Sequence, residues 1–436
     1  MSALAQRPHR GESRRQLGRT AVRATAGVTV IAALIAPSTS HAAVTSIRLK
    51  RAVSLRLPAN AGPGLSVIAA ASCVGVGLCT LAGTYTDASS VEQPMVVTRA
   101  GGHWARAIEL RLPSGAVSVG ATAESVSCTK VGSCVAAGGY EQSSHFHVFT
   151  ATESHGTWRR AMGVKLPGNA MAPGDASVGG IACTGPGNCV LVGAYLDQLG
   201  HPQGMVVTEF NGKWGRAREL RPPGNAGSAG GVFVNSVACP KIGSCVAVGR
   251  YNDKAGHARA MALAESNGNW HQATQLILPK DAAAVPLVSI PSVACTGAGS
   301  CIAVGQYRNR LGMFLAMSVT ESRGVWAHAR QVTKVPANAK AQASLFLNSV
   351  ACAHGGPCLA TGDYGLKSGG LGAVALTRSG AKWTAAAQIS TPPDGATGAK
   401  QDALGQAAGC SPGGFCAVGG LYRTSSLTTR DMAAVS

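Results

Sequence analysis

Seven pairs of cysteines recur at a nearly constant spacing, and they constrain the fold more than any other feature. Five residues separate the two cysteines of each pair, successive pairs begin 55 to 58 residues apart, and none of the 14 cysteines falls outside a pair. The pairs are Cys73/Cys79, Cys128/Cys134, Cys183/Cys189, Cys239/Cys245, Cys295/Cys301, Cys352/Cys358 and Cys410/Cys416. Such a chain is an array of repeats, not the two or three domains that its 436 residues would otherwise suggest.

The aromatic residues follow the same period. Every tyrosine lies six residues after the second cysteine of a pair, and a glycine precedes it by two positions. The six tryptophans follow that cysteine by 24 or 25 residues. Seven equivalent tyrosines indicate a packing role within the repeat, because a catalytic residue would have to break this symmetry.

Each copy contains four strand-like segments separated by turns. In the fifth copy "SVAC" and "CIAVGQY" flank a glycine-rich turn, and "FLAMSVTE" and the segment after Trp326 follow. The 57 glycines and 21 prolines, with 13% charged residues, favour many short strands and turns. Four antiparallel strands in about 56 residues predict one blade of a β-propeller, and the chain is therefore predicted to be an all-β, seven-bladed propeller.

The two ends of the chain are predicted to share a blade. The seventh copy stops at "DMAAVS" without a fourth strand, whereas Leu49–Ala61, "LKRAVSLRLPANA", matches the fourth strands of other copies such as "WARAIELRLPSGA". We expect the first strand after the N-terminal segment to complete the last blade. This closure removes the open sheet edge that would otherwise promote aggregation.

The cysteine pairs are predicted to be disulfides within single hairpins. Each pair flanks a five-residue turn, which places the two cysteines opposite one another on adjacent strands. Closing a loop of about seven residues stabilises the fold by roughly 2.4 kcal/mol in the loop-entropy treatment. A zinc site is the rival interpretation, but zinc ligands converge on one ion, whereas these pairs are spread around a ring without a histidine at constant offset. No metal and no cofactor are predicted.

The N-terminus resembles an export signal, predicted to span residues 1–42 and to precede a propeller of residues 43–436. Six arginines precede an apolar stretch from Ala24 to Ala36, which is followed by small residues up to Ala43. "SRRQLGR" also resembles a twin-arginine signal, and the export route stays open. We expect a secreted, monomeric product without a transmembrane segment, possessing disulfides as extracellular proteins do.

Charge gives a weaker indication of partners. Without residues 1–42 the chain keeps 32 basic and 18 acidic residues, a net charge of +14. Such a charge favours anionic partners such as cell-wall polymers, although simple solubility explains it equally well. Nucleic acid is not expected, because aromatic residues make up 5% of the chain and its tyrosines and tryptophans belong to the repeat. The close pair His145 and His147 could bind a metal, but alternating histidines on an exposed strand are usually solvated, and that is the expectation for them.

One turn of the repeat resembles a known family. "ESHGTW", "EFNGKW", "ESNGNW" and "ESRGVW" are similar to the Asp-box turns of sialidase-like (BNR) propellers, without the aspartate and with one residue fewer between glycine and tryptophan. The Gly-x-Tyr ending of the second strand is loosely similar to kelch propellers, and the Cys-x5-Cys blade resembles repeats of secreted actinobacterial proteins. The resemblance implies architecture only. The glutamates at these turns are repeat residues, so no catalytic residue is predicted.

The candidate site is the face that carries the variable loops. In a propeller, the loops between the second and third strands and between blades share one face, and loops on a rigid scaffold commonly bind ligands. The predicted ligand-binding residues are Asp87, Asp197, His201, Asp253, His257, Arg308 and Arg310. The alternative is ordinary turn chemistry, in which an aspartate after a strand bonds its own backbone.

Two functions follow from these features. The favoured one is a secreted, non-catalytic binding or scaffold protein that recognises a glycan, an anionic wall polymer or a protein through the variable face. The alternative is an extracellular glycoside hydrolase or polysaccharide lyase that uses loop carboxylates, which would need two such groups about 5–9.5 Å apart.

Overall fold

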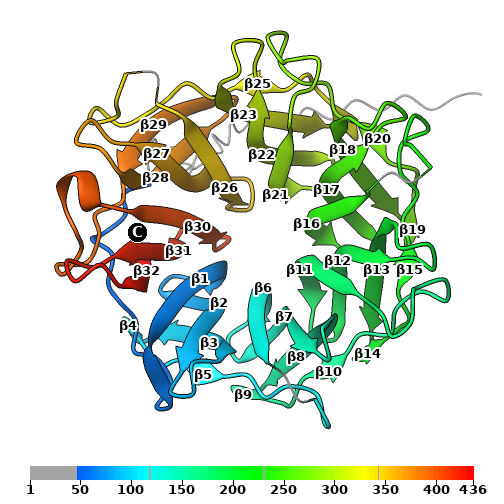
Figure 1. The fold of residues 1–436 in the computed structure, drawn as a ribbon, viewed down its shortest axis with the longest axis horizontal. Coiled ribbons are helices and arrows are strands. Elements are labelled where there is room, and N and C mark those ends of the chain that lie inside the picture. The colour runs from blue at the N-terminus through cyan, green and yellow to red at the C-terminus, as the bar shows by residue number, and fades with distance from the viewer. Residues whose placement is uncertain (1–46, 117–118, 229–230, 342) are drawn as a thin grey trace, which may run out of the picture. The chain divides into compact units, whose positions relative to one another are not determined.

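The chain folds into seven antiparallel sheets that follow one another along the sequence. The computed structural model describes residues 47–116, 119–228, 231–341 and 343–436, so the predicted export signal lies outside the described residues. Figure 1 shows the sheets as blades around a centre, and residues from all seven innermost strands line one central cavity. The predicted seven-bladed β-propeller is confirmed.

The strands fall into layers from the centre outward. The innermost strands are β1 (Ala61–Gly75), β6 (Gly120–Lys130), β11 (Ala176–Gly185), β16 (Phe233–Lys241), β21 (Ser289–Gly297), β26 (Leu345–Cys352) and β30 (Ala403–Cys410). The second strands are β2 (Leu78–Asp87), β7 (Ser133–Gln142), β12 (Asn188–Leu196), β17 (Ser244–Asn252), β22 (Ser300–Arg308), β27 (Cys358–Gly365) and β31 (Cys416–Arg423). Blades are numbered 1 to 7 in this order.

The outer layers complete each blade. The third strands are β3 (Glu92–Ala100), β8 (His145–Ser154), β13 (Pro202–Phe210), β18 (Ala258–Ser266), β23 (Phe314–Ser322), β28 (Leu371–Ser379) and β32 (Thr429–Val435). The outermost strand of blades 1 to 5 is in two pieces, namely β4 (His103–Trp104) and β5 (Ile108–Glu109), β9 (Thr157–Trp158) and β10 (Met162–Gly163), β14 (Lys213–Trp214) and β15 (Arg218–Glu219), β19 (Asn269–Trp270) and β20 (Thr274–Gln275), and β24 (Val325–Trp326) and β25 (Arg330–Gln331). Blade 6 has β29 (Lys382–Gln388), and a 3-10 turn, η1 (Gly398–Lys400), precedes blade 7.

The break in the outermost strand lets neighbouring blades bond one another. The Ala107 N–H donates to the carbonyl of Arg56 at 2.7 Å, and the Ala217 N–H donates to the carbonyl of Lys165 at 2.8 Å. Arginine side chains reinforce these links, since Arg216 donates to the Leu166 carbonyl at 2.9 Å. Arg106 and Arg160 donate equivalent bonds to the carbonyls of Leu57 and Leu112, so these arginines link neighbouring blades.

The N-terminal segment completes blade 7 as predicted. The Lys50 N–H donates to the Val435 carbonyl at 2.7 Å, and Val53 and Ala433 exchange two backbone hydrogen bonds of 2.8 and 2.9 Å. The contacts of β1 with β30 and β32 close the ring on the inside. Both ends of the propeller are thus held in one sheet.

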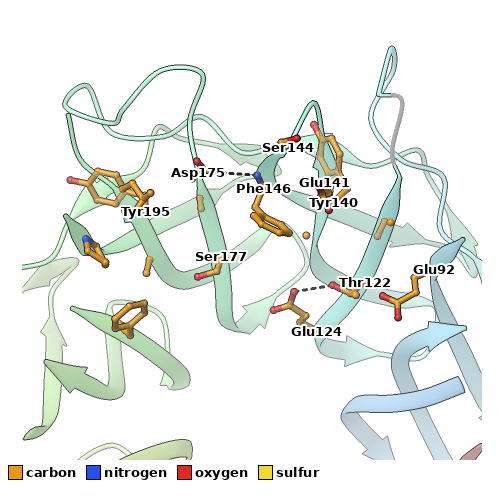
Figure 2. A pocket seen from close by; sticks show the side chains of 18 residues that line it. Glu92, Thr122, Glu124, Tyr140, Glu141, Ser144, Phe146, Asp175, Ser177 and Tyr195 are labelled. Atoms are coloured by element: carbon orange, nitrogen blue, oxygen red, sulfur yellow. Dashed lines mark hydrogen bonds between the residues drawn. The ribbon is translucent and has the colours of Figure 1, made fainter. Parts of the chain in front are cut away.

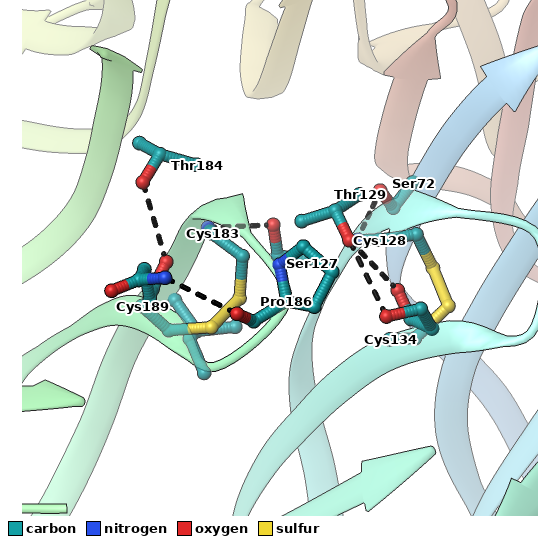
Figure 3. Close-up of a disulfide and its surroundings, with 12 residues drawn as sticks. Ser72, Ser127, Cys128, Thr129, Cys134, Cys183, Thr184, Pro186 and Cys189 are labelled. Atoms are coloured by element: carbon teal, nitrogen blue, oxygen red, sulfur yellow. Dashed lines mark hydrogen bonds between the residues drawn. A yellow bond between two sulfur atoms is a disulfide. The ribbon is translucent and has the colours of Figure 1, made fainter. Parts of the chain in front are cut away.

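All seven cysteine pairs form the predicted disulfides within their own hairpins, and no described cysteine is free. The bonds are Cys73–Cys79, Cys128–Cys134, Cys183–Cys189, Cys239–Cys245, Cys295–Cys301, Cys352–Cys358 and Cys410–Cys416. Figure 3 shows two of them with the serines that link adjacent innermost strands. Ser72 Oγ accepts from the Cys128 N–H, and Ser127 Oγ accepts from the Cys183 N–H, both at 2.9 Å. The disulfides of blades 2 and 3 are therefore tied to the preceding blade as well as to their own hairpins.

The disulfides of blades 1 and 4, which contain Cys79 and Cys245, differ in how they fit the strand register. Cys79 lies directly opposite Cys73 in the register of β1 and β2, as predicted. In blade 4 the register of β16 against β17 shifts between Ala238 and Lys241, so the expected direct pairing around Cys245 is disturbed although its disulfide forms. Cys79 and Cys245 are each 2% exposed. Both are therefore structural core residues, and the solvent-accessible surface of the turns comes from other side chains.

Candidate functional site

The predicted loop aspartates stabilise their own loops. Asp197 Oδ1 accepts hydrogen bonds from the N–H groups of Leu199 and His201, both at 2.9 Å, and its Oδ2 accepts from the Gln203 side chain at 3.0 Å. Asp87 and Asp253 repeat this pattern in blades 1 and 4.

These hydrogen bonds also lower the pKa of all three carboxyl groups. The largest contribution comes from the Val91 N–H for Asp87, from the His201 N–H for Asp197 and from the Arg259 side chain for Asp253. The geometry is that of the turn-chemistry alternative.

The other predicted residues also contact their own neighbourhood. His201 Nδ1 and His257 Nδ1 lie 3.9 and 3.8 Å from the carboxylates of their loops. Arg308 donates to the Gly312 carbonyl at 3.3 Å, and Arg310 donates to the Lys280 carbonyl at 3.0 Å. The structure places these residues in separate loops of one face, and ligand binding by them stays a prediction.

Six of the seven repeat tyrosines are buried and anchored. Their hydroxyl groups lie 2.7–2.9 Å from an Asn or Asp side-chain oxygen in the preceding interblade loop. The pairs are Tyr85–Asn60, Tyr195–Asn169, Tyr251–Asn225, Tyr307–Asp281, Tyr364–Asn338 and Tyr422–Asp394. This confirms a structural role for six members of the set.

Tyr140 in blade 2 is the exception. It is only partly buried, and its hydroxyl has no hydrogen-bond partner among the described residues. Two changes of the repeat explain this: Gly115 stands where the other copies have Asn or Asp, and β7 and β8 are joined by a two-residue turn instead of the longer loop. The turn residues Ser143 and Ser144 have φ values of 54° and 63°, which suits a tight hairpin.

A cavity of about 540 Å³ lies where blade 2 breaks the repeat. It opens on the loop face, between the loop ends of the strands of blades 2 and 3, and Glu92 of blade 1 and Phe233 of blade 4 reach its edge. Figure 2 shows Tyr140, Phe146 and several carboxylates around it. Phe146 lines the cavity and is 57% exposed, so its ring is accessible to a ligand.

Glu124 enters the cavity from a β-bulge on β6. The register of β6 against β7 shifts between Ala123 and Ser125, and bulges of this kind re-aim a side chain. Thr122 Oγ1 donates to Glu124 Oε1 at 2.9 Å. Solvent reaches the carboxyl group, but the surrounding walls bury it enough to raise its pKa, a shift that the Thr122 bond reduces.

Gly139 leaves space beside Glu124. A Cβ atom at this position would lie 3.4 Å from Glu124 Oε1, an ordinary contact. Other copies carry larger side chains at this point of the second strand, such as Thr84, Arg250 and Gln306. The cavity therefore exists partly because this side chain is absent.

Asp175 closes the opposite wall. Its Oδ1 accepts from the Phe146 N–H at 2.8 Å, and its Oδ2 lies 3.1 Å from His145 Nδ1. Burial would raise the pKa of Asp175, but these hydrogen bonds and the nearby imidazoles together lower it. His147 stacks on Tyr140 with ring centroids 5.2 Å apart, so neither histidine is simply solvated as expected.

The charge of the cavity is opposite to that of the chain. Glu92, Glu124, Glu141 and Asp175 line it, and its lining contains no lysine or arginine. Among the described residues, no group of three potential ligands is arranged to hold a metal ion. In the same residues, no helix has the length and apolar character needed to cross a bilayer.

Sequence reasoning selected loop residues of blades 1, 3, 4 and 5 on this face and missed this cavity. The residues beside it, Gly139 and the shortened hairpin at Ser143–Ser144, are exceptions to the repeat, and so is Gly115, which stands in place of the usual tyrosine partner. A comparison of the seven copies for missing side chains could have found them. The bulge that positions Glu124 recurs in all seven blades, and blade 2 is the one copy with a carboxyl group at that position.

Comparisons with known proteins give no family. No family model matches the chain, and no curated protein matches it. Similar solved structures include a protein of unknown function from Dyadobacter fermentans DSM 18053, with 14% identity, a TM-score of 0.47 and coverage of 89% of this chain and 98% of that one.

Two sialidases are also similar. The Hadza microbial sialidase Hz136 has 12% identity and a TM-score of 0.43, over 85% of this chain and 65% of that one. The Trypanosoma rangeli sialidase has 11% identity and a TM-score of 0.40, over 88% and 58%. The chain thus spans less than two thirds of either sialidase. At these values the likeness assigns no residue role.

Proposed function

We propose that this chain is a secreted binding protein that recognises a glycan through the blade 2 cavity on its loop face. The observation that carries the proposal is that blade 2, which departs from the repeat at Gly139 and at the hairpin Ser143–Ser144, borders a cavity of about 540 Å³. Ligand sites in proteins commonly have volumes of about 300–1,000 Å³ and combine apolar walls with a few convergent polar groups.

The lining has the chemistry that a sugar requires. The exposed ring of Phe146 and the ring of Tyr140 offer flat apolar surfaces. The carboxylates of Glu92, Glu141 and Asp175 are strong acceptors for hydroxyl groups. An anionic polymer is disfavoured at this cavity, because four carboxylic acids and no basic side chain line it. A neutral or amino-bearing glycan fits best.

The loop residues predicted from sequence extend the proposed site. His201 directly precedes Pro202, which lines the cavity, and Asp87 bonds Gln93 next to the lining residue Glu92. Seven disulfides support folding in an oxidising compartment, outside the cytosol.

A panel of soluble glycans tests this proposal by affinity electrophoresis and isothermal titration calorimetry. We expect at least one neutral or amino-bearing glycan to bind, and Phe146→Ala to weaken it at least tenfold. Phe210→Ala is the matched control, because Phe210 is 63% exposed in a turn at the opposite end of its strand. Absence of binding across the panel, or equal losses in both variants, would contradict the proposal.

A second candidate function is hydrolysis of the bound glycan. Its specific support is the opposite pKa shifts of Glu124, raised, and Asp175, lowered, in one cavity, since such pairs can divide acid and base roles. Product analysis after incubation with each bound glycan tests it. Turnover that disappears in Glu124→Gln would establish catalysis, whereas intact glycan recovered after prolonged incubation would exclude it for that ligand.

A further inference from the structure

The face opposite the cavity is formed by two sets of turns. The turn between the first and second strands of a blade lies beside the turn between its third and fourth strands. The Gly212 N–H donates to the Gly187 carbonyl at 2.9 Å in blade 3, and the Arg323 N–H donates to the Gly299 carbonyl at 2.7 Å in blade 5. We call this surface the turn face.

The turn face has no exposed acidic residue among those the structure describes. Only four of the 18 Asp and Glu residues after position 46 lie at this end of their strands, and they are the repeat glutamates Glu153, Glu209, Glu265 and Glu321. All four are buried, with 4–7% exposure, and burial raises their pKa. The remaining acids lie toward the loop face or in the interior.

Cationic side chains occupy the turn face instead. Blades 1 to 6 each place at least one lysine or arginine in or beside these turns, namely Arg99, Lys130, Lys213, Lys241, Arg323 and Lys382. All except the half-buried Arg99 are exposed. The exposed charged side chains that blades 1 to 6 place on this face are therefore all positive, whereas the loop face carries both signs.

Apolar side chains stand at the tips of the same turns. Val76 is 76% exposed, Val131 55%, Ile242 64% and Val325 70%, and Phe210 is exposed in the neighbouring turn of blade 3. Three of these apolar residues are close to a cation in the sequence. Val131 directly follows Lys130, Ile242 directly follows Lys241, and Val325 lies two residues after Arg323. A disulfide at the base of each first turn fixes the tips of Val76, Val131 and Ile242.

We propose that the turn face docks on a lipid bilayer that contains anionic lipids. Protruding apolar side chains would enter the interface between headgroups and acyl chains, and the adjacent cations would contact the headgroup phosphates. A soluble polyanion would use the cations but gain nothing from the apolar tips. In this orientation the cavity on the loop face points away from the membrane, so the two sites are independent.

Co-sedimentation with phosphatidylcholine vesicles, with and without 30% phosphatidylglycerol, tests the proposal. We expect binding only to the anionic vesicles. Replacing both Lys130 and Lys241 by serine should lower the partition coefficient about 25-fold at low salt, from about fivefold per lysine. Replacing Ile242 and Val131 by serine, with the charges intact, should lower it about tenfold or more.

Matched variants on the loop face separate docking from general attraction. Lys254→Ser with Lys400→Ser removes the same net charge, and Leu199→Ser removes a side chain that is 78% exposed. We expect less than a twofold effect from either change. Binding that falls equally in both sets, or no binding to anionic vesicles, would overturn the proposal.

A polyanion control addresses the other partner class. Two results together would identify a polyanion as the partner and contradict the lipid proposal. The first is retention on immobilised polyphosphate that is lost when Lys130 and Lys241 are replaced. The second is vesicle binding that does not change when Ile242 and Val131 are replaced. Thermal unfolding of every variant confirms that the ring is intact.

Discussion

The Ser66 hydroxyl donates a 2.6 Å hydrogen bond to Asp431, which joins the first blade to the last strand of the chain. The same carboxylate accepts from the Leu55 N–H at 3.0 Å, and the Asp431 N–H donates back to Ser66 Oγ at 3.0 Å. Asp431 is 1% exposed, so one buried side chain connects the N-terminal segment, β1 and β32. Ring closure thus has a polar component besides the shared sheet.

Asp431→Ala should destabilise the propeller by roughly 3 kcal/mol, because it leaves the Leu55 N–H and the Ser66 hydroxyl without their acceptor. Ser66→Ala removes one of these bonds and should cost about half as much. Urea unfolding followed by tryptophan fluorescence measures both values. An Asp431→Ala variant as stable as the wild type would show that the closure depends on backbone pairing and packing alone.

Much of this architecture could be predicted from the sequence because its determinants are local and repeated seven times. The spacing of cysteine, tyrosine and tryptophan predicts the blade, and the truncated seventh copy predicts the closure at Leu49–Ala61. The contacts that close the ring could not be predicted in detail. Asp431 lies 365 residues from Ser66, and no periodic pattern connects them.

The candidate site was harder to predict for a physical reason. Loop composition predicted Asp197, Asp253 and the histidines of the same loops as ligand-binding residues. The carboxylates of both aspartates, however, accept hydrogen bonds from backbone N–H groups of their own loops. The cavity depends on the side chain that is missing at Gly139, on the short hairpin at Ser143–Ser144 and on Glu124, which stands at a bulge that all seven blades share. The space that an absent side chain leaves becomes visible only when neighbouring strands are in place.

A single disulfide should be dispensable for the blade order. Replacing Cys295 and Cys301 together by serine is expected to cost about 2.4 kcal/mol, because the bridge restricts a loop of about seven residues in the unfolded chain. Equilibrium unfolding in urea tests the value. Loss of cooperative unfolding in the double variant would show instead that one staple determines the whole ring.

Two tyrosines at equivalent positions should differ in their contribution to stability. Tyr195→Phe removes contacts of 2.9 Å to Asn169 and 2.7 Å to Glu219 and should cost about 1–2 kcal/mol. Tyr140→Phe removes a hydroxyl that has no hydrogen-bond partner among the described residues, and should change the free energy of unfolding by less than about 0.5 kcal/mol. Equal losses would contradict the assignment of Tyr140 to a site rather than to the scaffold.

Asp363 should make the propeller less stable as the pH rises. Burial raises its pKa to about 6, although Asn348 donates to it at 3.1 Å. A group with a raised folded-state pKa favours the folded state at low pH, and this contribution is lost as the pH rises from about 4 through about 6. The shift of about two pKa units corresponds to roughly 3 kcal/mol as an upper value.

Asp363→Asn removes this titration without changing the shape of the side chain. We expect the variant to be more stable than the wild type by about 1–3 kcal/mol at pH 7.5, and nearly equal to it at pH 4. Thermal unfolding at the two pH values measures the difference. A variant that is destabilised equally at both would show that Asp363 is ionised and favourably paired in the folded protein.

The most direct test of the functional account is to fill the cavity. Gly139→Arg gives blade 2 the residue that blade 4 carries as Arg250, and a Cβ atom at Gly139 meets no atom closer than 3.4 Å. Calorimetry with the best glycan of the panel should show affinity at least about a hundredfold lower, or about 2.8 kcal/mol, for Gly139→Arg, and nearly unchanged for Gly139→Ala. Wild-type affinity in a folded Gly139→Arg variant would place the binding site elsewhere and contradict the account.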